Sequence, residues 1–511
     1  MSAFAMRLPD TRLFGPGLRA GGAVVLAAVA GAFVAYAPAQ PQVLEASLLF
    51  AAVAALLLLA VRLPVSVLPL ALVVALLGLG NMELSRIVPV PILGGQEKWV
   101  LIILAGVVFV GAGRDASVAR RPAWPATVLL GALFLVVSMG SLWYAQDRDL
   151  ARWAVLHQIV QMVALVAGFL WVRRAREARD LVACLAVVGT VSAALALWQF
   201  LRPAVFNGVF GGFTDPDMRA FMDYWARDVG RVGGLWVHAP PLAAFLSALL
   251  PAFLYVLLRR RSGLLALAAG AAFALAALAL ALTGTRMPLL GGAAGVAVFL
   301  AFWRGRRLSS RAGGFLVIAL LVAAPLAAGV LSASRGADAN VLARLASLFS
   351  EDREVSVSIS GRQAIYGTLL DAWRSEPWLG VGLGNTRPAV EEVTTFNSTP
   401  HAYWLGLLAE TGLVGAGLAA AMLGGMIPHY RRLLRRTAGS AERDFGVFVL
   451  AASSALLVGS LFDNAMLVWQ IGVLFWLLQG AVLSLSLRSE HALDADIDTT
   501  ESLGAEAANA G

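Results

Sequence analysis

A few arginine and histidine residues of this chain have the chemistry needed to act on a phosphate. Arg231, Arg286 and Arg362 lie in segments rich in glycine or polar residues, and His401 leads directly into an apolar stretch. A guanidinium group binds phosphate oxygens in pairs and keeps its charge, which suits it to hold a diphosphate leaving group. A neutral imidazole beside a bound phosphate accepts a proton. These residue types predict a site for an anionic substrate.

The segment around His401 predicts the start of a membrane helix. Thr399 is the expected N-cap and Pro400 the first helical residue. The positive end of the helix dipole disfavours imidazolium and attracts anions, so the ring would be neutral there. A capping or interfacial histidine is the alternative. His238 is a further candidate, because it follows Arg231 by about two helical turns and both could face one cavity, although a histidine in an apolar helix is more often a core residue.

A predicted amphipathic helix carries Arg362. Ser360 and Gln363 have the spacing of a capping box, which would place Arg362 in the first turn, where acidic residues are preferred. One face of this helix is apolar, formed by Ile365, Tyr366, Leu369, Leu370 and Trp373. Such a helix lies on the membrane surface, covers a cavity or simply supports its loop. For any single arginine, snorkelling of the side chain to the membrane interface is the alternative.

Acidic residues offer a competing site in another loop. Asp215 and Asp217, with Asp223 and Asp228 nearby, resemble the carboxylate pairs that hold a divalent metal beside a diphosphate, but most such pairs in loops are solvated turns. The single cysteine, Cys184, excludes an intramolecular disulfide and a cysteine-based metal site. The glycines at 380, 382 and 384 lack the spacing of a nucleotide loop and predict a sharp turn beneath the His401 helix.

The elements that must position these residues are membrane helices. The chain is 59% hydrophobic and only 14% charged over 511 residues, which predicts an all-α polytopic membrane protein with about 12–14 transmembrane helices and a long, partly helical periplasmic loop before the third-last helix. The positive residues are spread over membrane-flanking loops, so the net charge of +8 does not indicate a nucleic-acid partner. The predicted helices centre near residues 29, 53, 73, 105, 134, 161, 190, 246, 273, 295, 322, 415, 454 and 477.

Arginines gather on the loops of one side, which by the positive-inside rule makes both termini cytoplasmic and places the two long loops on the outside or in the periplasm. The predicted segments are a cytoplasmic N-terminus (1–19), N-terminal membrane helices (20–201), a periplasmic loop (202–234), central membrane helices (235–331), a large periplasmic loop (332–401), C-terminal membrane helices (402–487) and a disordered cytoplasmic tail (488–511).

The combination of motifs resembles the O-antigen ligase and O-antigen polymerase superfamily of bacterial envelope glycan enzymes. The resemblance covers about residues 230–425. Ala402 departs from the pattern, because many relatives have Asn or Ser there. The segments that carry the resemblance are Arg231-Val232-Gly233-Gly234 with His238 and Pro240, Thr283-Gly284-Thr285-Arg286, Ser360-Gly361-Arg362, Trp373 with Pro377 to Asn385, and His401 with Tyr403, Leu405, Glu410 and Gly412.

This resemblance implies a glycosyltransferase that needs neither metal nor cofactor and transfers a glycan from undecaprenyl diphosphate to a sugar hydroxyl at the periplasmic face. His401 would be the catalytic base on that hydroxyl or would orient it. Arg231, Arg286 and Arg362 would bind the diphosphate. His238, Tyr403 and Glu410 are secondary candidates.

The acceptor separates two versions of this activity. A polymerase extends a lipid-linked glycan, whereas a ligase transfers the glycan to lipid A–core. The predicted helix count slightly favours a polymerase, because it exceeds the usual twelve of the ligases. Membrane lipids and a chain-length regulator are candidate partners. The alternatives are a metal-dependent polyprenyl-phosphate glycosyltransferase centred on Asp215 and Asp217, and a flippase or transporter for a lipid-linked sugar.

Overall fold

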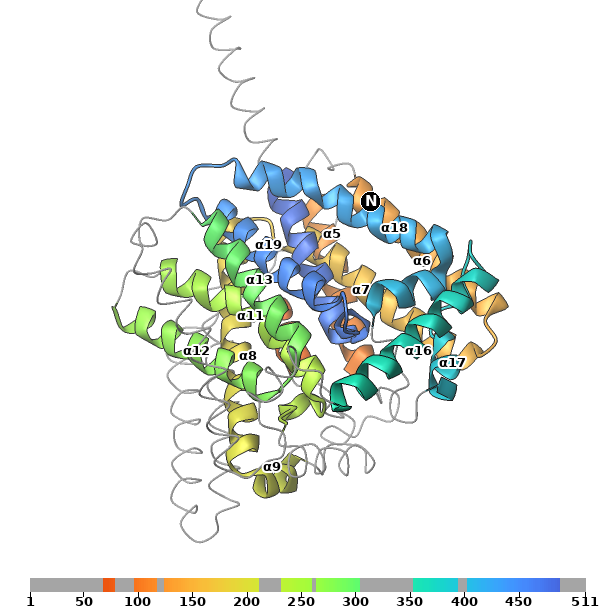
Figure 1. Cartoon of the computed structure of the whole chain (residues 1–511). Helices are drawn as coiled ribbons and strands as arrows, with labels where there is room; N and C mark the ends of the chain where they lie inside the picture. Colours follow the sequence, from red (N-terminus) through yellow and green to blue (C-terminus); the bar gives the residue numbers. More distant parts are fainter. Residues whose placement is uncertain are drawn as a thin grey trace, which may run out of the picture. The chain divides into compact units, whose positions relative to one another are not determined.

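A computed structural model describes residues 68–78, 96–116, 124–210, 231–259, 263–303, 353–393 and 402–487 of the chain. The chain separates into two compact units, Met1–Leu68 and Pro69–Gly511, and the contacts described below all lie in the second unit. Within the described ranges the secondary structure is helical, without a strand, which confirms the prediction of an all-α polytopic membrane protein. Figure 1 presents these helices in sequence colours.

The first described helices are α3 (Leu68–Gly78), α5 (Gln96–Ala116), α6 (Ala126–Tyr144), α7 (Arg148–Trp171), α8 (Ala175–Leu201), α9 (Pro203–Phe210) and the 3-10 turn η5 (Gly234–Trp236). They are followed by α11 (Ala239–Arg259), α12 (Gly263–Leu282), α13 (Arg286–Phe302), α16 (Arg353–Ser375), α17 (Thr386–Val393), α18 (Tyr403–Leu434), α19 (Ala441–Gly459), η6 (Ala465–Leu467) and a helix at Trp469–Leu487.

Six of the described helices are long and apolar enough to cross a membrane: α6, α7, α8, α11, α18 and Trp469–Leu487. Every predicted helix centre that falls in the described ranges lies inside a helix. The centres near 29, 53 and 322 lie outside these ranges, so the total of 12–14 transmembrane helices stays a prediction.

Helix α11 packs against α8, α12, α13 and α19, and α13 packs along α19 (Figure 1). The approach of α13 to α19 depends on Gly291, because a Cβ atom there would lie 2.3 Å from the carbonyl oxygen of Ala455. Small residues allow such close backbone contact between membrane helices.

The α11, α13 and α19 helices define two ends of this bundle. The outer end, named for its predicted side of the membrane, carries residues 231–238, the α12–α13 turn at 283–285 and the 460–468 connection. The inner end carries Arg259, Phe302 and Asp444, which terminate or begin the same helices at their opposite ends. For these three helices the two sets of residues therefore lie at opposite ends, while the identity of each membrane face stays a prediction.

Three predicted helix starts are wrong, one of them at Thr399, where α18 begins instead at Tyr403. Helix α16 begins at Arg353 and continues through Ser360 and Gln363, so the capping box does not start it and Arg362 lies in the helix interior. Residues 353–359 contain neither proline nor glycine, and nothing in that stretch stops the helix from extending towards the N-terminus. The helix expected near Leu235 begins instead at Ala239, because Gly234 and Val237 have positive φ angles that interrupt helical geometry.

Candidate functional site

Arg231 is held by the turn that precedes Arg286. Its Nε donates a hydrogen bond to the carbonyl oxygen of Thr283 at 2.7 Å, and its Nη2 donates to Oγ1 of Thr285 at 2.8 Å. Thr285 is the N-cap of α13 and Arg286 is the first residue of that helix. Two arginines that lie far apart in the sequence are thus brought together by one short turn.

Asp463 lies at the same end of the bundle and was not a candidate in the sequence. It is 7% exposed and is the acidic residue of the connection between α19 and Trp469–Leu487. Its Oδ1 accepts the backbone N–H of Asn464 at 2.7 Å. Burial raises the pKa of the Asp463 carboxyl, whereas the Asn464 N–H and the charges of Arg362 and Arg231 oppose that rise. A buried carboxylate therefore lies within electrostatic range of two predicted arginines.

Helix α16 brings Arg362 and Tyr366 to this region. Arg362 is half-buried, and its positive charge acts on Arg286 as well as on Asp463. Tyr366 follows one helical turn later. Burial raises the pKa of its hydroxyl, the charge of Asp463 adds to the rise and that of Arg362 opposes it. The three predicted arginines consequently share one region, although they come from three different segments.

His238 also lies within electrostatic range of Arg231. Burial lowers the pKa of its imidazole to about 4, and the positive charge of Arg231 contributes to the shift. The ring is therefore neutral at physiological pH. Its backbone N–H donates to the carbonyl oxygen of Trp236 at 2.6 Å, which fixes the residue immediately before α11.

Helix α18, which follows His401, begins beside Asp463. Its first residue is Tyr403 and its N-cap is Ala402, so the predicted cap at Thr399 is wrong. Ala402 has no side-chain oxygen to act as a cap. The N–H of Tyr403 instead donates to the carbonyl oxygen of Asp463 at 3.3 Å, so a tertiary contact replaces the cap. His401 itself lies outside the described residues.

The predicted sharp turn beneath this helix is confirmed. Gly380, Gly382 and Gly384 all have positive φ angles. The N–H of Val381 donates to the carbonyl oxygen of Ala409, and the N–H of Gly382 donates to that of Glu410, both at 3.0 Å.

Gly412 interrupts α18 opposite this turn, with φ 62° and ψ −167°. Beyond the break, the N–H groups of Leu413 and Val414 donate to the carbonyl oxygens of Pro377 and Trp378, at 2.9 and 3.1 Å. The turn thereby accepts the hydrogen bonds that the broken helix cannot make internally. It fixes the short first segment of α18, 403–411, relative to the longer remainder.

Glu410 connects the turn to α17. Its buried carboxylate accepts the hydroxyl of Thr386 at 2.5 Å and the backbone N–H groups of Gly384 and Thr386. These contacts give Glu410 a role in positioning the scaffold. Tyr403, another secondary candidate, packs its ring edge-on against Trp404 with centroids 5.0 Å apart.

The apolar face of α16 forms a small core with these elements. Ile365 and Leu369 are buried with Val390 of α17 and Ala409 of α18, and Tyr366, Trp373 and Leu405 pack around them. We call α16, the 376–385 turn and α17 the cap unit. The predicted amphipathic helix therefore packs on the first segment of α18.

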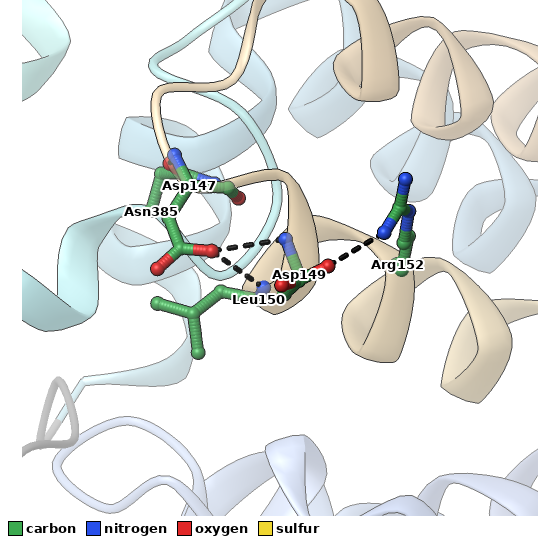
Figure 2. A network of polar contacts seen from close by, with 5 residues as sticks. All are labelled: Asp147, Asp149, Leu150, Arg152 and Asn385. Carbon is green, nitrogen blue, oxygen red and sulfur yellow. Dashed lines mark hydrogen bonds and ion pairs between the residues drawn. The ribbon is translucent and has the colours of Figure 1, made fainter.

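The connection between α6 and α7 anchors the cap unit (Figure 2). Asn385 accepts the N–H of Asp147 through Oδ1 at 2.7 Å and donates to the Asp147 carbonyl oxygen at 3.2 Å. The Asp147 carboxylate in turn accepts the N–H groups of Asp149 and Leu150 and begins α7. The hydroxyl of Tyr144 adds a hydrogen bond to the Leu379 carbonyl oxygen at 2.9 Å.

The competing acidic candidates, Asp215 and Asp217, lie outside the described residues, as do Asp223 and Asp228. Within the described ranges, no group of three or more His, Cys, Asp or Glu side chains is arranged to hold a metal ion. The acidic loop stays a prediction.

Comparison with known proteins finds a family match over part of the chain. Residues 271–420 match the O-antigen ligase family, which confirms over this part of the chain the resemblance to the O-antigen ligase and polymerase superfamily. The matched residues include Arg286, Arg362, His401 and Glu410, whereas Arg231 and Asp463 lie outside them. No curated protein matches the chain. The match supports a membrane enzyme of the O-antigen ligase and polymerase type.

Proposed function

We propose that this protein is a membrane glycosyltransferase that moves a glycan from undecaprenyl diphosphate to a sugar hydroxyl at the periplasmic face of the bacterial inner membrane. The observation that carries the proposal is the convergence of Arg231, Arg286 and Arg362 around the buried Asp463. This arrangement lies at the start of the helix that follows His401 in the sequence.

The charges of the site suit a diphosphate. Three guanidinium groups contribute three positive charges, which the Asp463 carboxyl reduces to two when it is ionised, and His238 adds none because its pKa is about 4. A diphosphate esterified at both ends carries two negative charges, so it would neutralise the site. Guanidinium groups would also stabilise the charge that develops on the leaving oxygen during transfer.

The reaction joins one oxygen to one carbon and releases one diphosphate. The acceptor hydroxyl oxygen attacks the anomeric carbon of the donor, while the bond between that carbon and the phosphate oxygen breaks and its electron pair leaves with undecaprenyl diphosphate. His401 takes the hydroxyl proton or orients the hydroxyl. In this scheme no step requires a metal ion, because the arginines offset the charge of the leaving group.

The acceptor divides the proposal into two versions. In the polymerase version, which we slightly prefer, the acceptor is a second lipid-linked glycan and a chain-length regulator is a candidate partner. In the ligase version the acceptor is lipid A–core. The preference rests on the predicted helix count, which exceeds the twelve usual for ligases.

The first experiment measures glycan transfer by purified protein from a polyprenyl-diphosphate oligosaccharide, with and without EDTA. His401→Ala should lower the rate about 10²- to 10⁴-fold, and EDTA should have no effect. His429→Ala is the matched control, because that histidine bonds Ser486 on the inner side of the bundle. Activity that is lost to EDTA and survives in His401→Ala would overturn the proposal in favour of a metal site at Asp215 and Asp217.

A lipid-linked sugar flippase is the remaining alternative. Transfer of the oligosaccharide to an acceptor in detergent solution excludes it as the sole activity, because a flippase changes only the side of the membrane on which its lipid lies. Reconstituted protein that moves the donor between leaflets but never releases undecaprenyl diphosphate would instead favour transport.

A further inference from the structure

Gln199 is a buried amide in the last turn of an otherwise apolar membrane helix, α8. Its side chain is 1% exposed. A polar residue in such a place is costly unless its hydrogen bonds are made, and it suggests a function by default. Gln199 lies outside every motif that the sequence indicated, and it belongs to a segment that the O-antigen ligase match does not include.

Both ends of the Gln199 amide are used. Its Oε1 accepts the backbone N–H groups of Gly233 at 3.0 Å and Gly234 at 2.8 Å. Its Nε2 donates to Oδ1 of Asn207 in α9 at 3.2 Å. Asn207 is itself 1% exposed, and the neighbouring Phe206 packs edge-on against Trp198. Helix α9 thus fixes the amide so that its oxygen faces the 233–234 backbone.

The backbone that Gln199 holds is strained. Gly234 has φ 54°. Val237 has φ 65° and ψ −50°, a conformation that is unfavourable for a β-branched residue. With the hydrogen bond from the His238 N–H to the Trp236 carbonyl oxygen, it forms a tight three-residue turn. Such backbone persists only where surrounding contacts impose it, and these positions are common at functional sites.

The 233–237 segment is packed tightly against itself. A Cβ atom on Gly233 would lie 2.3 Å from the Val237 carbonyl oxygen, so the chain folds back on itself directly beside Gln199. Arg231 precedes this segment by two residues and His238 follows it. Arg231 also bonds the α12–α13 turn, so its guanidinium group depends on the segment for its placement relative to Arg286.

We propose that Gln199 is a positioning residue for the diphosphate site, which acts by holding the Gly233–Gly234 backbone so that Arg231 meets the donor phosphates together with Arg286. This role rests on the proposed function. Gln199 touches neither substrate nor reacting atoms. Its removal should weaken donor binding and leave the chemical step, which depends on His401, close to normal.

Gln479 provides a matched control. It is also 1% exposed in an apolar membrane helix, and it also uses both ends of its amide: Oε1 accepts the hydroxyl of Tyr430 at 2.7 Å and Nε2 donates to Oγ of Ser453 at 2.8 Å. Neither Tyr430 nor Ser453 belongs to the 231–238 segment or the 283–285 turn. Gln199→Leu and Gln479→Leu therefore remove the same groups from equally buried places.

The experiment measures binding of polyprenyl diphosphate without a sugar, and then the KM and kcat of glycan transfer, in purified full-length variants whose thermal unfolding is also recorded. Gln199→Leu should weaken binding and raise the donor KM about tenfold, as expected for the loss of one well-placed polar interaction, with kcat changed less than about twofold. Gln479→Leu should lower the unfolding temperature without changing either value.

Gln199→Glu should restore donor binding to within about threefold of wild type, because a carboxylate also accepts both N–H groups and Asn207 can turn its amide to donate to the second oxygen. If Gln199→Leu does not fold, Asn207→Ala gives the same test, since it leaves the Gln199 amide without its anchor and should raise the KM several-fold.

Equal donor binding in Gln199→Leu and wild type, or equal losses in Gln199→Leu and Gln479→Leu, would overturn the positioning role. Either result is distinguishable from failure of the proposed function, because Arg362→Ala is measured beside them. Loss of binding in Arg362→Ala with normal binding in Gln199→Leu rejects only Gln199, whereas wild-type protein that neither binds polyprenyl diphosphate nor transfers glycan rejects the proposed function itself.

Discussion

The two ends of the helix bundle differ in the charges that surround their arginines. At the inner end, Arg443 is 3% exposed and donates to the carbonyl oxygens of Phe302 at 2.6 Å and Leu434 at 3.2 Å, which lie at the C-terminal ends of α13 and α18. Arg259 pairs with Asp444 and lies over the ring of Tyr255. These positive charges face the negative ends of helices or a carboxylate, and there they stabilise the fold.

At the outer end, Arg286 lies where a helix begins, whereas Arg231 donates to the Thr283 carbonyl oxygen just beyond the C-terminal end of α12. Arg286 is the first residue of α13, and Arg231 and His238 precede α11. The positive end of a helix dipole disfavours another positive charge, and Arg286 and Arg362 also repel one another. This arrangement lowers the stability of the protein without substrate, and a bound anion would offset that cost. The contrast teaches that the charge around each guanidinium group, and not the number of arginines, separates the two sets: Arg259 pairs with a carboxylate, whereas Arg286 and Arg362 act on one another.

The largest expected effect comes from removing an outer arginine. Arg286→Ala and Arg362→Ala should each lower kcat/KM for the lipid-linked donor about 10²-fold, the loss expected for a charge-assisted hydrogen bond of about 3 kcal/mol. Transfer kinetics and membrane insertion should be measured together. Arg374→Ala is the control, because Arg374 lies on the same helix but is exposed and paired with Asp371. Normal activity in both site variants would remove the basis for a diphosphate clamp.

Removing an inner arginine should produce the reverse pattern. Arg443→Ala leaves two helix-terminal carbonyl oxygens without this donor and should lower the free energy of unfolding by about 2 kcal/mol. The donor KM of the folded protein should stay unchanged. Unfolding in detergent and kinetics of the soluble fraction check this. A donor KM that rose as much as in Arg286→Ala would mean that the two ends are not functionally distinct.

Replacing Asp463 should have a smaller effect on donor binding, and in the opposite direction. Asp463→Asn removes a negative charge near Arg231 and Arg362, so polyprenyl diphosphate should bind about threefold more tightly. Because burial raises the pKa of this carboxyl, the folded protein binds its proton more readily than the unfolded chain. Stability should therefore decline as the pH rises through the interval between the unfolded and the raised folded pKa, and Asp463→Asn should abolish that decline. Weaker diphosphate binding would instead indicate that Asp463 holds the guanidinium groups in place.

The smallest effect concerns His238. Its pKa is lowered to about 4, so the unfolded chain binds the proton more readily than the folded protein, and stability should fall only as the pH drops from about 6.5 towards 4. Between pH 7 and 8 the ring is neutral and donor binding should be flat. His238→Gln should leave that flat region unchanged. A titration of donor binding near pH 6.5 that disappears in His238→Gln would show that the ring is charged when the donor binds.

The sequence determined the class of fold and the candidate arginines. Apolar stretches of membrane-spanning length, such as those that became α7 and α11, depend on local composition alone, because the lipid imposes the same length on each helix. The sequence also predicted the amphipathic face that includes Ile365 and Leu369, and the sharp glycine turn at 380–384. Helical spacing and glycine conformation are local properties.

Helix starts were less predictable. Ser360 had the right spacing for a cap but lies inside α16, and the start of α18 is fixed by the Asp463 carbonyl oxygen in place of a side-chain cap. Nothing local to Asp463 marked it, because a single acidic residue between two helices is ordinary in sequence. A signal for Gln199 did exist, since a glutamine near the end of an apolar helix is costly, but its partners Gly233 and Asn207 could not be read from the chain.

What the sequence by itself determined is therefore a polytopic helical protein with its arginines and His401 distributed over segments of one predicted side. Only the tertiary structure decided that Arg231, Arg286 and Arg362 share one place, that Asp463 lies among them, and that the 376–385 turn supports the helix after His401. The physical reason is that helix length and amphipathicity follow from nearest neighbours along the chain. The convergence of charges depends on hydrogen bonds and packing between segments that are close only after folding.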